Sequence, residues 1–144
     1  MTQEEIVNGN KLIAEFMGYK FSHYTIDPDK LIIEISPVDE SSTSYYPDDF
    51  DTCWCCSKTP DDSLSWKLPN QLNFNLSWNK LMEVWVEFLN RTTKYGLTFC
   101  ATICYLPQYR MAYEIGFGLG DIDIAYSNIL YLIDWYNKNK PTNE

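Results

Sequence analysis

The spacing of hydrophobic and polar positions predicts three helices. Apolar residues recur three or four positions apart over residues 4–17, 77–90 and 121–138. Gly18 stands where a left-handed residue commonly ends a helix, and Ser77 can cap the start of the second one. The inward stripe predicted for the second helix consists of Trp78, Leu81, Met82, Trp85, Phe88 and Leu89, and that of the third of Ile122, Ala125, Ile129, Leu132 and Tyr136.

Other stretches alternate with a period of two, which is typical of strands. The sequence KLIIEIS at 30–36 predicts a strand, with 19–24 as its partner across a turn at 27–30. Residues 97–105 and 109–117 read as a hairpin, with the first strand buried on both faces. Within the polar stretch 37–72, residues 51–57 and 64–68 are the expected short strands.

This order of elements, α-β-β-α-β-β-α, predicts an α+β fold. We expect an antiparallel or mixed β-sheet covered by three helices in a layered sandwich. A chain of 144 residues is one domain by size, so residues 1–144 are predicted to form a single domain. It carries a long acidic, aromatic and Cys-rich insertion at about 37–72.

Three blocks of the sequence carry a resemblance. NKLIAEFMGY (10–19), SWNKLMEVW (77–85) and IDIAYSNILYLIDWYN (122–137) resemble a family of small phage and prophage proteins from gut Bacteroidetes. That family is similar, more distantly, to the phage α-β-α sandwich domains. The resemblance implies a layered fold and a phage origin. It brings no established activity.

Charge narrows the functional classes. The chain has a net charge of −9, and residues 39–62 hold seven acids against Lys58, so this segment alone carries −6. Such a field repels nucleic-acid phosphates and anionic membranes, so we expect neither as a partner. The N-terminal stretch has acids where a signal peptide needs bases, and no apolar run is long enough to span a bilayer. A cytoplasmic location in the bacterial host cell follows as the expectation.

Five cysteines raise the question of metal or redox chemistry. Cys53, Cys55 and Cys56 stand with zero or one residue between them, whereas zinc knuckles usually space paired ligands by two to four. Buried, reduced packing cysteines are the favoured interpretation. A zinc site with a fourth ligand from Cys100, Cys104 or His23 stays open, as does a disulfide.

No pattern for catalysis emerges. Gly116, Gly118 and Gly120 precede a helix but lack phosphate-binding spacing, and Asp121 and Asp123 would repel an anion there. The single histidine, His23, has no local Cys or Ser partner motif. The predictions are therefore no enzymatic activity, no catalytic residues, no metal site and no cofactor.

The insertion offers the one concentrated surface chemistry. Aromatic and acidic residues alternate there, and such groups either fold back on the core or contact a partner. We predict a partner-binding surface made of Tyr45, Tyr46, Asp48, Asp49, Phe50, Asp51 and Trp54.

The predicted function is that of a non-enzymatic phage- or prophage-encoded accessory protein that binds a basic protein partner. Because phage accessory proteins often act against host defence, the resemblance extends to such a role. The alternative is a small-ligand binding protein that sequesters a nucleotide signal, with aromatic stacking on the base and Arg110 or Lys67 on the phosphate. Homo-oligomerisation stays open.

Overall fold

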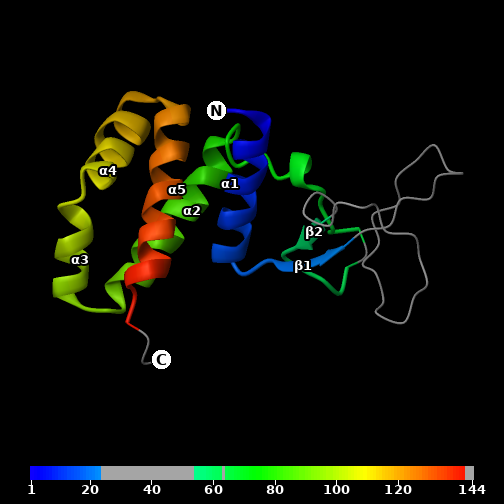
Figure 1. The fold of residues 1–144 in the computed structure, drawn as a ribbon, viewed down its shortest axis with the longest axis horizontal. Coiled ribbons are helices and arrows are strands. Elements are labelled where there is room, and N and C mark those ends of the chain that lie inside the picture. The colour runs from blue at the N-terminus through cyan, green and yellow to red at the C-terminus, as the bar shows by residue number, and fades with distance from the viewer. Residues whose placement is uncertain (24–53, 63, 142–144) are drawn as a thin grey trace, which may run out of the picture. The chain divides into compact units, whose positions relative to one another are not determined.

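The computed structural model describes residues 1–23, 54–62 and 64–141, and helices dominate these residues (Figure 1). Backbone contacts divide the chain into two compact units. A helical unit comprises 1–17 and 73–144, and a small β unit comprises 18–72. Each is described by itself below.

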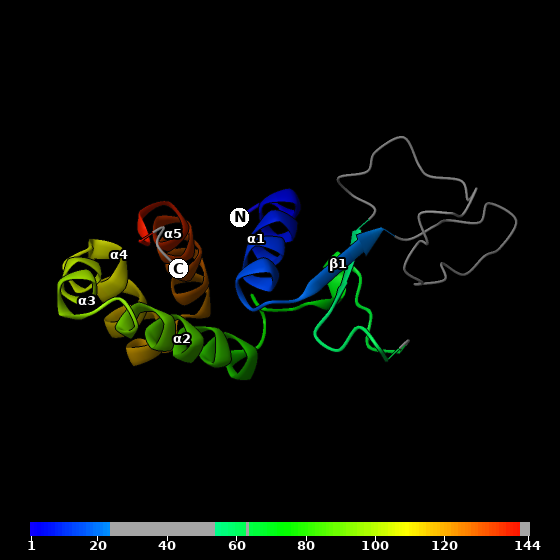
Figure 2. The same ribbon diagram turned by 90° about the horizontal axis from the view of Figure 1, so that it is seen from below.

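The helical unit is built around its last helix. The helix α5 (Ile122–Asn139) contacts α1 (Gln3–Phe16), α2 (Trp78–Thr93), α4 (Pro107–Arg110) and the π-helical segment η2 (Met111–Phe117). The helix α3 (Leu97–Cys104) contacts α2 and α4. Figures 1 and 2 show α5 among these elements, with α2 crossing the unit from the α3 side toward the start of α1.

The helix ends follow the capping chemistry in the sequence. Thr2 Oγ1 accepts from the Glu5 amide at 3.1 Å while Glu5 Oε2 accepts from the Thr2 amide at 2.9 Å, a reciprocal capping box. Ser77 and Asp121 cap α2 and α5 in the same way, each with its side chain accepting a backbone N–H. The predictions of the three long helices and of the Ser77 cap are therefore confirmed.

The core of the helical unit is aliphatic and aromatic. Phe16, Phe88 and Tyr136 bring α1, α2 and α5 together, with ring centroids 5.6–6.4 Å apart. Such tilted and edge-on contacts are the favoured geometries of aromatic pairs. The fully buried side chains include Ile13, Leu81, Val84, Phe88, Ile103, Ala112, Ala125, Tyr126, Ile129, Leu132 and Ile133.

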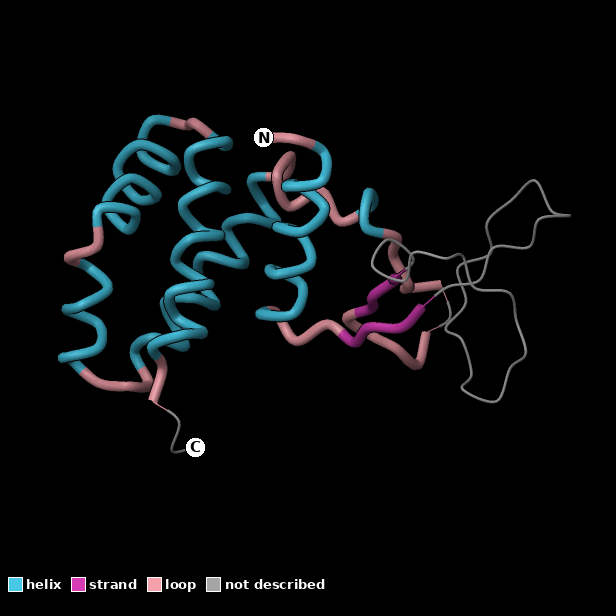
Figure 3. Tube along the Cα trace, viewed as in Figure 1, coloured by secondary structure: helices cyan, strands magenta, loops and turns pink. Residues whose placement is uncertain are grey.

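The predicted α+β sandwich is wrong, because the hairpin at its centre is helical. Residues 97–104 form α3, and residues 107–117 form α4 and η2, all coloured as helices in Figure 3. In α3 only Ile103 is buried, whereas a central strand would bury both faces. Pro107, predicted to lie in the hairpin turn, stands in the first turn of α4, where its fixed φ angle and missing N–H suit a helix start.

Small residues allow the second of these segments to pack closely on α5. Ala112 and Gly116 are both buried and four positions apart, so they share one helix face. A Cβ atom on Gly116 would lie only 2.6 Å from the Cα of Ala125, so η2 and α5 approach backbone to backbone. This close approach leaves no room for a larger side chain at position 116.

The β unit contains the only sheet among the described residues. Strand β1 (Lys20–His23) pairs antiparallel with β2 (Trp54–Ser57), with Phe21 opposite Cys56. Cys56 also exchanges two backbone hydrogen bonds with Lys67, at 2.8 and 3.0 Å. The strand predicted within 51–57 is confirmed, that at 64–68 is reduced to this single bridge, and that at 30–36 lies outside the described residues.

Candidate functional site

The predicted partner-binding surface is described at one position only. Trp54 begins β2, is 3% exposed, and its ring lies 5.5 Å from that of Phe21. Tyr45, Tyr46, Asp48, Asp49, Phe50 and Asp51 lie outside the described residues. In this structure Trp54 serves packing of the β unit, and the surface as a whole stays a prediction.

The cysteines of β2 are packing residues, as predicted. Cys55 and Cys56 are free thiols with no exposed surface. Burial raises the pKa of Cys55 to about 11 and that of Cys56 to about 12, the latter with help from the neighbouring Cys55. Both thiols are therefore protonated at neutral pH, which makes them poor nucleophiles. Cys53 lies outside the described residues.

The cysteines of α3 differ from this expectation. Cys104 is exposed and Cys100 is half-buried, with its thiol donating to the Thr92 carbonyl oxygen at 3.3 Å. Both face Tyr109, whose pKa is raised first by burial and then by Cys104. The strand prediction made these thiols buried, and the helix places them near water instead. Among the described His, Cys, Asp and Glu side chains, no group of three is placed to hold a metal ion.

An exposed apolar row on α2 is the most distinctive surface of the helical unit. Trp78, Met82 and Val86 are spaced four residues apart and are 37%, 44% and 48% exposed. Positions four apart stack along one side of a helix, so these three side chains form a continuous line. The prediction that Trp78 and Met82 belong to the inner stripe is wrong, because both side chains are exposed.

The row stands on a rigid aromatic base. The ring of Trp78 packs on Phe117 of η2 at 5.6 Å, and Trp85 packs on the same Phe117 at 5.5 Å. Trp85 also contacts Tyr109 of α4 at 5.3 Å. Because these rings pack α2 against α4 and η2, the row should lose little conformational entropy when a partner binds to it.

Charges border the row on one side. Glu83 follows Met82 and Glu87 follows Val86, so a line of carboxylates runs next to the apolar line. Glu87 Oε1 accepts from Arg91 Nε at 2.8 Å, whereas Glu83 forms no ion pair with another residue in the described part of the chain. A partner segment that covers the row therefore meets negative charge along one edge.

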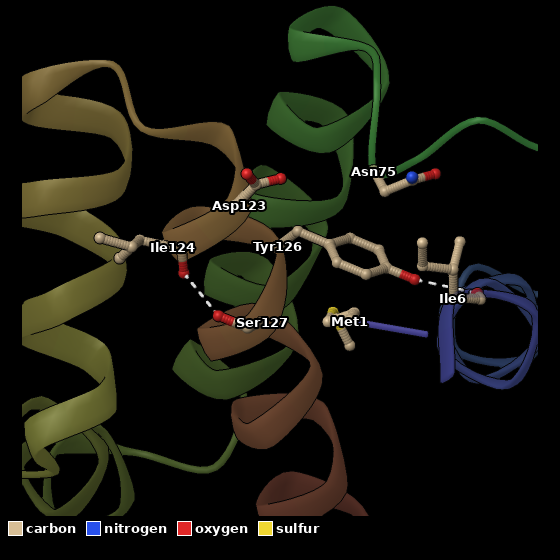
Figure 4. Close-up of a pocket in the computed structure, with 7 residues that line it drawn as sticks. All are labelled: Met1, Ile6, Asn75, Asp123, Ile124, Tyr126 and Ser127. Atoms are coloured by element: carbon tan, nitrogen blue, oxygen red, sulfur yellow. Dashed lines mark hydrogen bonds between the residues drawn. The ribbon is translucent and has the colours of Figure 1, made fainter. Parts of the chain in front are cut away.

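A pocket of about 450 Å³ opens in the same unit (Figure 4). It lies where the start of α1, the segment before α2 and the start of α5 come together. Figure 4 shows the ring of Tyr126 reaching from α5 toward Ile6 of α1. Its lining consists of Met1, Ile6, Asn75, Asp123, Ile124, Tyr126 and Ser127.

Tyr126 holds the wall of this pocket in place. Its hydroxyl hydrogen-bonds to Asn10 Oδ1 at 2.9 Å and to the Ile6 carbonyl oxygen at 3.1 Å, which ties α5 to α1. Burial raises the pKa of Tyr126 well above its usual range, so the group is neutral at physiological pH. Asp123 is then the charged side chain of the lining.

Gly120 and Asp121 form the turn and the N-terminal cap of α5. Gly120 has a φ of +78°, and Asp121 accepts from the Ile124 amide at 3.1 Å. Gly116 serves helix packing, as shown above. The interpretation of the three glycines as a turn before the helix holds for Gly120, whereas Gly116 and Gly118 are helical.

No family model matches the chain, and neither the curated proteins nor the solved structures give a significant match. The resemblance to phage proteins therefore stays a prediction. In the described part of the chain, none of the helices combines the length and the apolar character needed to cross a membrane.

Two signals in the sequence pointed to the exposed row. The apolar positions of α2 span far more than the arc of about 100° that one buried face needs. Val86 was left out of the predicted stripe although it follows Trp78 and Met82 at a constant spacing of four. The pocket had no such signal, because its residues come from three separate segments.

Proposed function

We propose that this protein is a non-enzymatic accessory protein that binds a basic protein partner, and that the row Trp78–Met82–Val86 supplies the apolar contact. The observation that supports this most is the exposed row itself, lying on a rigid aromatic base. Its geometry suits an amphipathic helix that lays apolar residues along α2. The bordering Glu83 and Glu87 favour lysine or arginine at the edge of that helix.

The row alone does not give tight binding. Complete burial of an aliphatic side chain is worth about 1.5–3 kcal/mol. Since the row residues are already more than half covered, about 1 kcal/mol each remains, or about 3 kcal/mol in total. A millimolar complex needs about 4 kcal/mol, so the proposal requires charge attraction and at least one further anchor.

Charge supplies part of the difference. The chain carries −9, and residues 39–62 carry −6 of it. Such a field accelerates encounter with a basic partner and opposes pairing with a second, equally acidic copy. The predicted surface at Tyr45, Tyr46, Asp48, Asp49, Phe50 and Asp51 belongs to the proposal as the steering segment.

The cellular setting is part of the proposal. The described cysteines are free thiols, which fits a reducing compartment, and we place the protein in the bacterial cytoplasm. A role against host defence follows only from the resemblance to phage proteins. The nucleotide-binding alternative is less favoured, because the charged side chain of the pocket is the carboxylate of Asp123, which repels phosphate.

A peptide selection tests the proposal without knowledge of the partner. A displayed library of random helical peptides about 18 residues long, roughly five turns, is enriched on the immobilised protein. We expect peptides with apolar residues three or four apart and lysine or arginine beside them. Their binding should weaken as salt rises from about 50 to 500 mM, because screening shortens the range of the charges.

Matched variants decide whether the row is responsible. Met82→Gln/Val86→Gln replaces two row residues by a good helix former. Leu97→Gln/Tyr105→Gln makes the same kind of change at two other exposed apolar positions, which lie outside the row. The selected peptides should lose at least about tenfold in affinity for the first variant and bind the second like the unchanged protein. Equal affinity for both variants, or enrichment of acidic peptides, would reject the proposal.

A further inference from the structure

The pocket of the helical unit has the composition that a basic side chain requires. Its lining combines one carboxylate, Asp123, with the apolar side chains of Met1, Ile6 and Ile124. Lysine and arginine carry an aliphatic stem that packs on apolar surface and a cationic head that pairs with a carboxylate. We propose that this pocket binds a lysine or arginine side chain of the protein partner, with Asp123 as its counter-ion. The inference rests on the proposed function and names the residue that the partner must present.

Acidic residues occupy the first turns of the two helices that begin at the pocket. Glu4 and Glu5 lie in the first turn of α1, and Asp121 and Asp123 lie at the start of α5. Both helix starts contribute lining residues, and of these four carboxylates Asp123 is the one that lines the pocket. The N-terminal dipole of α5 does not reverse the sign of this charge, because Asp121 already accepts from the Ile124 amide at 3.1 Å. Asp123 is therefore the counter-charge that the lining offers to a cationic ligand.

The wall of the pocket is ready to receive a ligand. The Tyr126 hydroxyl is engaged with Asn10 and with the Ile6 carbonyl, so it fixes the two helices that flank the opening. A cavity of about 450 Å³ lies within the range of roughly 300–1,000 Å³ typical of ligand sites. It can hold a long side chain together with part of its backbone.

The pocket also stands close in sequence to the apolar row. Asn75 lines the pocket, and Trp78, three residues later, begins both α2 and the row. From Trp78 to Val86 the row extends about 12 Å, since a helix rises about 1.5 Å per residue. A partner helix that covers the row would thus need one basic residue near the Trp78 end of its apolar stripe. This basic residue would be the further anchor that is needed because burial of the row alone gives too little binding energy.

Small probes test the pocket independently of the row. N-acetyl-lysine N-methylamide is titrated into the ¹⁵N-labelled protein, with the norleucine and glutamate analogues as comparisons. We expect saturable shifts of the Ile124 and Ser127 amides with the lysine probe, weaker shifts with norleucine and none with glutamate. Asp123→Asn should weaken the lysine probe about two- to fivefold, which is the range of a solvent-exposed ion pair.

Asp121→Asn is the matched control. It removes the same charge from the same helix end, but asparagine caps a helix as well as aspartate and position 121 does not line the pocket. It should change the affinity for the lysine probe much less than Asp123→Asn. Equal effects of the two variants, or shifts that ignore Asp123→Asn, would overturn the inference.

The two proposals fail separately. If the lysine probe does not bind while selected peptides still depend on Met82 and Val86, the pocket inference falls and the proposed function stands. If the probe binds through Asp123 but no peptide depends on the row, the pocket remains a basic side-chain site and the α2 contact is rejected.

Discussion

Gly116 offers a sharp test of the packing that replaces the expected hairpin. A Cβ atom at this position would lie 2.6 Å from both the Cα and the Cβ of Ala125 and 2.8 Å from its amide nitrogen. Comfortable carbon contacts lie at about 3.5–4.0 Å, so Gly116→Ala must push η2 and α5 apart by about 1 Å. Two of these three neighbouring atoms belong to the backbone, which cannot rotate away as a side chain can. We therefore expect the variant to lose stability.

The magnitude is the balance of two effects. Overpacking a tight contact costs about 1–3 kcal/mol, whereas replacing a helical glycine by alanine gains up to about 1 kcal/mol. The net loss should be about 1–2 kcal/mol. For a chain of 144 residues this corresponds to a fall in Tm of about 4 °C per kcal/mol.

Gly118→Ala supplies the comparison. Gly118 has helical angles (φ −68°, ψ −40°), and its Cβ would meet only the Tyr113 carbonyl oxygen, at 3.2 Å. This variant should be as stable as the unchanged protein or slightly more so. Urea unfolding followed by tryptophan fluorescence measures both. If Gly116→Ala proves as stable as Gly118→Ala within about 0.5 kcal/mol, the packing of η2 on α5 is not as described.

Two further predictions concern single groups. In a maleimide reaction at pH 7.5 mapped by mass spectrometry, Cys104 should react fast while Cys55 and Cys56 stay protected until the protein unfolds. The reason is that burial raises the pKa of Cys55 to about 11 and that of Cys56 to about 12. Early labelling of either residue would contradict the buried strand. Gly9→Ala should destabilise the protein by about 1–3 kcal/mol in the same urea assay, because its Cβ would lie 2.5 Å from the Tyr126 hydroxyl oxygen, and unchanged stability would argue against the contact of α1 with α5.

The elements that could be predicted were those with a long, regular period and a cap. The second and third predicted helices combine a sustained apolar stripe with Ser77 and Asp121 as caps, and they are α2 and α5 in the structure. Local chemistry is sufficient there, because the cap and the stripe specify the same conformation.

The predicted hairpin failed because short apolar runs fit both periods. In 97–105 nearly every residue is apolar or small, so alternate positions and positions four apart look equally regular. The deciding contacts join different elements: Phe99 of α3 packs on Trp135 of α5, and Gly116 of η2 packs on Ala125 of α5. Tertiary packing chose the helix, and no local pattern reports it.

Of the two candidate sites, the apolar row left a signal in the sequence and the pocket did not. The apolar row could be recognised from the sequence as one apolar residue too many on each turn of α2, although Trp78 and Met82 were assigned to the core and Val86 was left out. The pocket could not be predicted from the sequence, because its lining residues Ile6, Asn75 and Asp123 are spread over more than a hundred positions. A site assembled from three segments becomes visible only when the helices are placed.

Methionine oxidation tests the central claim most directly, because it reports the exposure of the row and its occupation in one measurement. Met82 of the row and Met111 of η2 are 44% and 40% exposed. In the free protein, hydroxyl-radical labelling should oxidise them at similar rates. Saturation with a selected basic peptide should slow the oxidation of Met82 by about tenfold and leave Met111 unchanged. A Met82 that is already protected in the free protein, or that stays equally reactive in the complex, would contradict the account.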